Sequence, residues 1–358
     1  MNEDCLKLTC YFGERHRSAQ GFVADELLDI YERHEIAASI MLRGIEGFGL
    51  KHHLRSDRSL SLSEDLPAVT VAVDTRARIE KALEEVKRIP GVGLVTLERA
   101  LLVRGDVHAL QLPETHHEAT KLTIYLGRQE RSYRVPAHVA ACDLLHRRGV
   151  AGATVLLGVD GTARGRRARA EFFSRNTDVP TMVIAVGDGQ AIGRVLPELG
   201  GLLHDPLISV ERVRICKRDG ELLERPHRLP GADEHGMALW QKLSIFASEA
   251  AHFRGQPLHR AVTRRLRTTG ASGVTTIRGI WGYHGGHAPH GDRAFRVVRH
   301  VPTLTIAVDT PERIAEIFPI IDEVTRDRGL VTVEMVPALR ARSGKEERGG
   351  FRLAHHPF

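Results

Sequence analysis

The sequence of 358 residues has few cysteines and no long apolar segment. No hydrophobic run reaches the roughly 18 residues that a membrane-spanning helix needs, and the acidic start Met-Asn-Glu-Asp is unlike a signal peptide. The four cysteines, Cys5, Cys10, Cys142 and Cys216, lie far apart without a C-x-x-C motif, which argues against a disulfide framework. We therefore expect a cytoplasmic protein that is not embedded in a membrane.

Aromatic residues make up only 5% of the chain, and the usual catalytic motifs are missing. There is no G-x-S-x-G, H-E-x-x-H or Walker A motif and no early G-x-G-x-x-G, so we expect no enzyme activity. Nucleic-acid binding on a sheet needs stacking aromatic side chains, which are scarce here. Of 51 basic residues only 8 are lysine, and 45 acidic residues leave a formal charge of +6. This balance is compatible with a small anionic ligand and does not indicate nucleic acid.

One pattern is present three times along the chain. Each copy opens with a strand-like segment that begins with lysine, at Lys7, Lys121 and Lys242. About 60 residues later each copy has a strand that begins with proline, at Pro67, Pro180 and Pro302. About 31 residues after the proline, each copy has a strand that ends in glutamate, at Glu98, Glu211 and Glu334. Three landmarks in the same register indicate one unit of about 100 residues in triplicate.

The pattern within each unit predicts the order β-α-β-β-α-β. Its first helix is expected at 22–34, 136–148 and 257–268, with Gly149 and Gly270 as helix stops. In the third unit the second helix is expected to begin at Thr310, with Pro311 in its first turn. This order describes an α+β, ferredoxin-like unit.

We expect the units at 1–104, 119–218 and 239–340, followed by a mobile tail at 341–358. A unit of about 100 residues with open sheet edges buries its inner face poorly by itself. The sequence therefore predicts a pseudo-trimer within one chain, and thus a monomer that resembles a homotrimer.

The loop after the second strand opens with Gly-x-x-Gly in all three units. The glycine pairs are Gly44 and Gly47, Gly158 and Gly161, and Gly279 and Gly282. In the outer units an arginine precedes the motif and an aromatic residue follows it: Arg43 and Phe48, and Arg278 and Tyr283. Glycine lets backbone N–H groups approach an anion, arginine adds a planar donor fork, and an aromatic ring can stack on a nucleobase. These residues are our candidate ligand site; the alternative is that the glycines only form the turn.

The same loops are long and basic. Their basic residues are Lys51, Arg55 and Arg58; Arg164, Arg166, Arg167 and Arg169; and Arg293, Arg296 and Arg299. Long loops in compact domains are usually functional or disordered. We interpret them either as responsive arms that contact an anionic ligand or a partner, or as charged surface loops.

Two further sets of residues call for an interpretation. His284, His287 and His290 form the one dense histidine cluster, with spacing that can ligate zinc, copper or nickel, but the other units lack it. The recurrent Glu98, Glu211 and Glu334 are expected to be structural and to pair with arginine across a unit interface.

The segments Ala38–Gly44, Leu62–Pro67 and Gly93–Glu98, and in the third unit Arg278–Gly282 and Gly329–Glu334, resemble domain-of-unknown-function family 190. Its members are described as PII-like signalling proteins. The resemblance implies a ferredoxin-like fold, trimeric assembly with small ligands bound in the clefts between subunits, and a long loop that corresponds to the T-loop of PII proteins. The phosphate-binding lysine of PII proteins has no counterpart before the last strand of any unit.

The sequence thus predicts a non-enzymatic regulatory protein that senses a small anionic ligand, with a nucleotide as the expected class, in clefts between units. The resemblance further implies a protein target such as a membrane transporter or channel. The alternative is a divalent-metal-binding protein similar to the cation tolerance proteins of the same superfamily, with His284, His287 and His290 as ligands.

Overall fold

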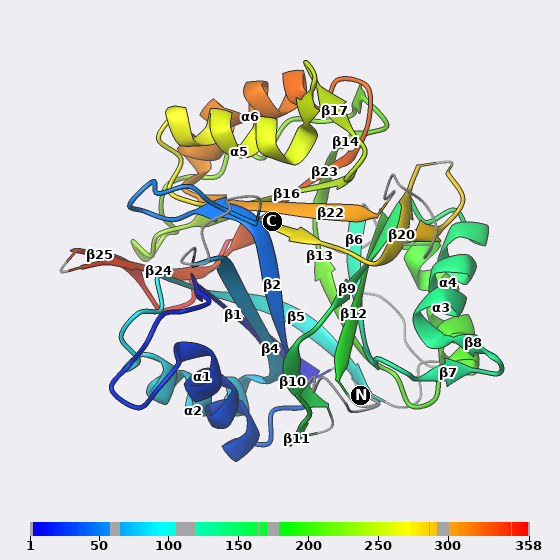
Figure 1. Ribbon diagram of the computed structural model, residues 1–358, viewed down its shortest axis with the longest axis horizontal. Helices are drawn as coiled ribbons and strands as arrows, with labels where there is room; N and C mark the ends of the chain where they lie inside the picture. Colours follow the sequence, from blue (N-terminus) through cyan, green and yellow to red (C-terminus); the bar gives the residue numbers. More distant parts are fainter. Residues whose placement is uncertain are drawn as a thin grey trace.

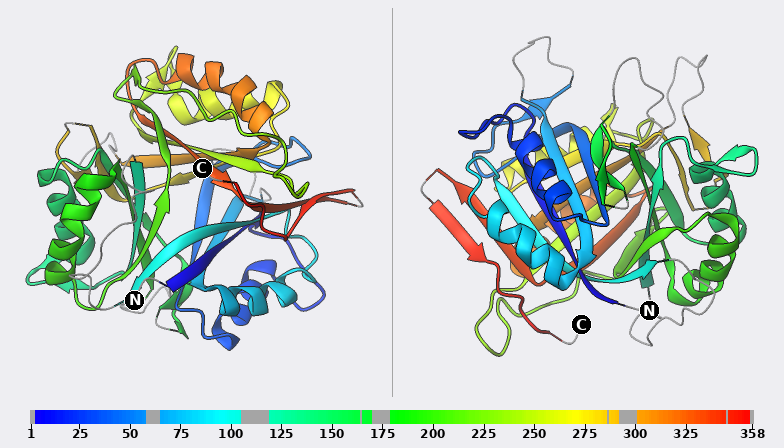
Figure 2. Two further views of the ribbon diagram at one scale, coloured as in Figure 1. Left: turned by 180° about the vertical axis from the view of Figure 1, so that it is seen from behind. Right: turned by 90° about the horizontal axis from the view of Figure 1, so that it is seen from below.

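The computed structural model describes residues 3–57, 65–104, 119–163, 165–169, 179–285, 287–291, 301–344 and 346–356. Three units surround a common axis, with their strands facing inward and a pair of helices on the outer side of each (Figure 1). The view from behind shows the same triangular arrangement, with one helix pair at each corner (Figure 2). The chain is therefore a pseudo-trimer of α+β units, as the repeats predicted.

The first unit has the predicted element order. Its elements are β1 (Glu3–Gly13), α1 (Val23–Arg33), β2 (Ala38–Phe48), β3 (Arg55–Ser56), β4 (Pro67–Thr75), α2 (Arg76–Val86) and β5 (Leu94–Arg104). β1 lies between β4 and β5, and β2 pairs with the other edge of β4, all antiparallel. The order β5–β1–β4–β2 is that of a ferredoxin-like sheet.

The other two units repeat this plan with short additional strands. The second contains β6 (Ala119–Gly127), β7 (Arg131–Ser132), β8 (Val135–Pro136), α3 (Ala137–Arg147), β9 (Gly152–Leu157), β10 (Asp160–Ala163), β11 (Arg166–Arg167), β12 (Pro180–Asp188), α4 (Gly189–Leu202), β13 (Leu207–Arg212), β14 (Arg214–Arg218) and β15 (Glu221–Leu222). The third contains β16 (Trp240–Ser248), β17 (His252–Phe253), β18 (Gln256–Pro257), α5 (Leu258–Thr268), β19 (Val274–Arg278), β20 (Trp281–His284), β21 (His290–Gly291), β22 (Pro302–Asp309), α6 (Pro311–Val324), β23 (Leu330–Val336), β24 (Ala338–Ser343) and β25 (Glu346–Gly350).

Local sequence signals set the helix ends. Gly149 and Gly270 follow α3 and α5 with φ of 74° and 76°, the left-handed conformation in which glycine ends a helix. The Thr310 hydroxyl caps α6 by accepting the backbone N–H of Arg313 at 3.3 Å, and Pro311 follows it in the first turn. In the part of the chain that the structure describes, no helix combines the length and the apolar character needed to cross a membrane.

Neighbouring units pair through two sets of strands. At the Gly-x-x-Gly motif the chain after each second strand passes into the adjacent unit, so that β10 pairs with β2, β20 with β9, and the end of β2 with β19. The last strands of the units form the second set of pairs around the axis: β5 pairs with β13, β14 with β23, and β24 with β5. Over the described residues these pairings join 21 strands into one curled antiparallel sheet.

The chain after residue 340 differs from the mobile tail that the sequence analysis expected. β24 and β25 form a hairpin, and β24 pairs with the edge of β5 from Ala338 to Ala341. The guanidinium of Arg340 lies over the ring of Phe351, 4.8 Å from the ring centroid. The backbone N–H of Ala354 donates to the carbonyl oxygen of Pro337. The hairpin covers an edge strand that would otherwise expose unpaired backbone groups, and it closes the ring of units.

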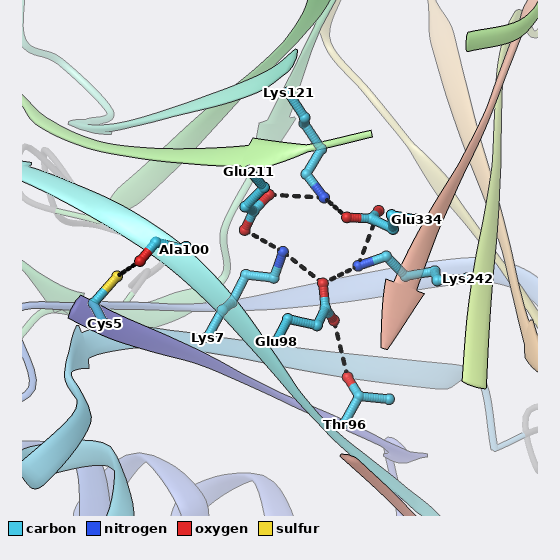
Figure 3. A network of polar contacts seen from close by, with 9 residues as sticks. All are labelled: Cys5, Lys7, Thr96, Glu98, Ala100, Lys121, Glu211, Lys242 and Glu334. Carbon is cyan, nitrogen blue, oxygen red and sulfur yellow. Dashed lines mark hydrogen bonds and ion pairs between the residues drawn. The ribbon is translucent and has the colours of Figure 1, made fainter. Parts of the chain in front are cut away.

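Six buried charged side chains form a closed ring on the axis (Figure 3). Each unit contributes the lysine of its first strand and the glutamate of its last strand: Lys7, Lys121, Lys242, Glu98, Glu211 and Glu334. Within a unit the ammonium-to-carboxylate distances are 2.8, 2.7 and 3.1 Å, and each lysine also contacts the glutamate of a neighbouring unit. All six side chains are at most 7% exposed.

The ring corrects one prediction about the recurrent glutamates. They do pair across unit interfaces, but with lysine and not with arginine. The sheet register places each glutamate opposite the lysine of its own unit, and all three such pairs meet on the axis, where each lysine also reaches the next unit. Burial alone would raise the pKa of Glu98 and Glu211, but the ammonium groups outweigh it and hold both pKa values below the ordinary value. The lysines thus favour the ionised form of these two carboxylates.

We expect the protein to be a monomer of 39.7 kDa in solution. All three interfaces of the pseudo-trimer are already paired within one chain, so a second chain is not needed to bury them. Light scattering coupled to size-exclusion chromatography measures the mass. A value near three times that of the chain would contradict this expectation.

Candidate functional site

The Gly-x-x-Gly motifs lie where each second strand crosses into the neighbouring unit. Gly47 is opposite Thr275 of the third unit, and Gly161 is opposite Ile40 of the first. A Cβ atom on Gly47 would lie 2.4 Å from the carbonyl oxygen of Val274, which is too close for any side chain. The first glycines, Gly44, Gly158 and Gly279, are similarly crowded by the proline that begins the third strand. Close packing between backbones thus accounts for all three motifs.

The two aromatic residues after the motifs pack in the cores of neighbouring units. Phe48 is 4% exposed and belongs to the core of the third unit. Tyr283 is 3% exposed, belongs to the core of the second unit, and donates its hydroxyl hydrogen to the carbonyl of Val150 at 3.0 Å. The structure gives both rings a packing role, although Phe48 also lies in the wall of a cavity.

The two arginines before the motifs are paired with carboxylates of their own units. Arg43 contacts Glu14, with Nε 2.7 Å from a carboxylate oxygen. Arg278 contacts Glu249 at the equivalent position, with distances of 2.7 to 3.1 Å, and Asp57 of the first unit at 3.3 Å. Neither arginine is among the residues that line the cavity between the first and third units.

A cavity of about 690 Å³ separates the first unit from the third. The first unit contributes the loop base Gly47–Lys51 and the turn Pro90–Leu94, and the third contributes Ser272–Thr275 and Val308–Thr310. The C-terminal hairpin supplies a further wall through Leu339, Ala341–Gly344 and Arg348. Small-molecule sites usually have volumes of about 300–1,000 Å³, so this cavity can hold a ligand the size of a nucleotide.

The inside of this cavity is apolar and its rim is cationic. Leu50, Leu94, Trp240 and Ile306 pack on a small apolar cluster formed by the hairpin and the ends of β22 and β23. The exposed side chains in the lining include Lys51, Arg342 and Arg348, which make no ion pair within the described residues. The single carboxylate of the described lining, Asp309, accepts backbone N–H bonds from Ser272 at 2.8 Å and Thr310 at 2.9 Å.

His16 joins three segments at the edge of the cavity. Its Nε2 lies 3.2 Å from the carboxylate of Asp65, and its Nδ1 lies 2.8 Å from the carbonyl oxygen of Gly91. The hydrogen bond to Asp65 is the main cause that raises the pKa of His16. Arg55 also contacts Asp65, at 3.1 Å, so this carboxylate is not available to repel an anion in the cavity.

The equivalent boundary between the third and second units carries the opposite charge at one position. Arg342, near the end of β24, and Asp219, directly after β14, occupy equivalent positions: their backbone N–H groups donate to the carbonyl oxygens of equivalent glycines, Gly93 at 2.8 Å and Gly329 at 2.9 Å. The Asp219 carboxylate lies close to Gly285: a Cβ atom on this glycine would be only 2.1 Å from a carboxylate oxygen. An anion would thus meet a guanidinium between the first and third units and a carboxylate between the third and second units.

The histidine cluster does not form a metal centre in the structure. His284 Nδ1 lies 3.7 Å from Asp219, and the ring packs edge-to-face on His287 with centroids 5.8 Å apart. Burial lowers the pKa of His284. His290 Nδ1 lies 2.9 Å from the carbonyl oxygen of Ala288 instead. No group of three or more His, Cys, Asp or Glu side chains among the described residues is arranged to hold a metal ion.

The basic loop residues are only partly described. Arg58, Arg164, Arg293, Arg296 and Arg299 lie outside the described residues. Arg167 is largely buried and binds Asp160 at 2.7 Å together with Asp25 and Asp29 of α1, so it fastens the loop of the second unit to the first unit. It has a structural partner on both sides of this interface.

Sequence reasoning missed the two most informative sets of residues. The axial lysines could have been found, because lysine is scarce and three of the 8 lysines stand at one repeat position. The cavity residues Arg342 and Arg348 carried no such signal, since they lie in the segment interpreted as a tail.

Comparison with known proteins gives one family. The chain matches the profile of domain-of-unknown-function family 190 (DUF190), described as an uncharacterized ACR, over residues 5–102, 119–215 and 240–338. It is 30% identical over 91 residues to the UPF0166 protein MJ1524 of Methanocaldococcus jannaschii, an alignment that covers 25% of this chain and 83% of that protein.

Two solved structures align with the chain at low identity and low TM-score. Aspartate kinase from Synechocystis aligns over 96% of this chain at 12% identity and a TM-score of 0.24, and the chain spans 45% of that protein. An anthrone oxidase-like protein aligns over 59% of this chain and 92% of its own length, at 11% identity and a TM-score of 0.17.

Proposed function

The chain belongs to the DUF190 family, which it contains in three tandem copies, and from this membership and the geometry of its clefts we propose that it is a PII-like regulatory protein that binds a nucleotide between its first and third units. The observation that carries the proposal is the cavity of about 690 Å³ with an apolar interior and a rim of three unpaired cations. Trp240 and Ile306 suit a flat base, and Lys51, Arg342 and Arg348 suit phosphate groups.

The position of the cavity suggests how ligand binding affects the long loop of the first unit. Its wall includes Gly47–Lys51, the base of the long loop of the first unit, and Ala341–Gly344 of the C-terminal hairpin. A ligand in this place contacts the loop base and both adjoining units at once. We infer that occupancy changes the order of the loop, which then acts on a protein target, and that the role is one of binding without catalysis.

Calorimetry with ATP, ADP, AMP and cyclic nucleotides is expected to show one strong site per chain. Asp219 places a negative charge between the third and second units, at the position where Arg342 places a positive charge between the first and third units. Three equivalent sites per chain, or no binding of any of these nucleotides, would contradict the proposal.

Arg342→Ala is expected to weaken nucleotide binding by about tenfold or more, because a charge-assisted hydrogen bond contributes about 1.5–3 kcal/mol. Arg43→Ala is the matched control, since Arg43 stands beside the same loop but is bound to Glu14 and is absent from the lining. Equal losses of affinity in the two variants would place the ligand at the Gly-x-x-Gly motif and not in this cavity.

A further inference from the structure

A second, much smaller cavity lies on the axis, next to the charged ring. It measures about 60 Å³ and is lined by equivalent residues from all three units. Lys7, Lys121 and Lys242 lie on one side, and the next residues along the same strand faces are Thr9, Thr123 and Ser244. One water needs roughly 10–15 Å³ of such space, so the cavity holds a few waters or one small ion and excludes a nucleotide.

The lysines around this cavity have unused hydrogen-bond donors. An ammonium group has three N–H donors, and each lysine of the ring contacts two carboxylates. No further acceptor contacts these three groups among the described residues. All three ammonium groups line the cavity, whereas Glu334 is the single ring carboxylate in its described lining. The cavity therefore meets the positive side of the ring.

The rest of the lining favours a guest that only accepts hydrogen bonds. Three hydroxyl groups, of Thr9, Thr123 and Ser244, can each donate, and the walls beyond them include the apolar side chains of Leu42, Leu156 and Ile277. A water molecule would have to direct its own hydrogens toward donors or apolar groups. An anion has no hydrogens to place, and buried donors without acceptors are costly.

We propose that the axial cavity binds one small monovalent inorganic anion, of the size of chloride or bromide. The remaining N–H groups of Lys7, Lys121 and Lys242 hold it, and the hydroxyls of the neighbouring layer complete its shell. The anion links all three units. This cavity shares Tyr11 and Ile306 with the lining of the nucleotide cavity, but the lysines and hydroxyl groups that hold the anion are not part of that lining, so the two sites can be tested separately.

Crystals of the full chain soaked in bromide provide the direct test. We expect one anomalous peak on the axis, beside the three lysine ammonium groups. Only ordered waters at this position, or bromide peaks confined to the surface, would overturn the proposal.

Thermal unfolding gives a second test in solution. The unfolding temperature is expected to rise and saturate with chloride or bromide but not with gluconate at equal ionic strength, because gluconate is too large for the cavity. Ser244→Leu fills the cavity while all three lysines are retained, and it is expected to abolish the halide effect. Ser244→Thr, which copies Thr9 and Thr123, is the matched control and should keep it. Identical behaviour of halide and gluconate with the unsubstituted protein would also overturn the proposal.

Discussion

Glu98→Leu is expected to lower the free energy of unfolding by about 3–5 kcal/mol. The Glu98 carboxylate is 3% exposed and contacts Lys7 at 2.8 Å as well as Lys242 of the third unit. Its removal leaves the ring with three buried ammonium groups and two carboxylates, and thus with one positive charge that no group compensates. Denaturant unfolding followed by far-UV circular dichroism measures the change.

The double variant Lys7→Met, Glu98→Leu separates charge balance from packing. It removes one ammonium and one carboxylate, so the four remaining side chains are again neutral as a set. We expect it to be more stable than Glu98→Leu alone, because replacing a buried ion pair by apolar groups is often close to neutral. Glu80→Ala is the surface control: its pair with Arg76 is half exposed, and an effect below about 1 kcal/mol is expected. If Glu98→Leu is as mild as this control, the unpaired ammonium group is not costly and the expectation is wrong.

The ring also predicts how stability depends on pH. Glu98 and Glu211 have pKa values held below the ordinary value, so their contribution is present above about pH 4.3, the usual pKa of Glu, and is lost as the pH falls below it. Between pH 5 and pH 3 the unsubstituted protein should therefore lose more stability than Glu98→Leu. Equal pH slopes for the two proteins would contradict this expectation.

The fold could be predicted from the sequence because its strongest signals are local or repeated. The three landmarks fixed the number of units, and the predicted first helices agree with α1, α3 and α5 to within one residue at each end. The exchange of strands between units could not be predicted, because pairing between distant segments leaves no local pattern. For the same reason the hairpin from Ala338 to Gly350 was interpreted as part of a tail.

The candidate site was only partly predictable, because its residues come together from distant parts of the sequence. The Gly-x-x-Gly motif has the composition of an anion-binding loop, but Gly47 and Gly161 are also what two crossing backbones require. The cavity combines segments as distant as Pro90–Leu94, Ser272–Thr275 and Ala341–Gly344, so its cationic rim appears only in three dimensions. The repetition marked both the glutamates and the lysines as landmarks, but the lysines were not recognised as the partners of the glutamates.

Gly47→Ala is expected to destabilise the protein by about 3 kcal/mol, the upper end of the usual range for an overpacked site. The added Cβ would lie 2.4 Å from the carbonyl oxygen of Val274 and 3.2 Å from the Cα of Thr275. Both are backbone atoms of β19 in the third unit, which cannot rotate away as a side chain can. The methyl group therefore separates β2 from β19 and weakens the interface that closes the ring of units.

Gly49→Ala is the matched control for this substitution. It makes the same chemical change two residues further along the same loop, where a Cβ would have no atom within 4 Å. We expect its free energy of unfolding to stay within about 0.5 kcal/mol of the unsubstituted protein. The comparison isolates the crossing of the two strands, because both variants lose one glycine from the same loop base. If the two variants unfold at the same denaturant concentration, β2 does not lie as close to β19 as it does in the structure. The glycines of the motif are then free to bind a ligand instead.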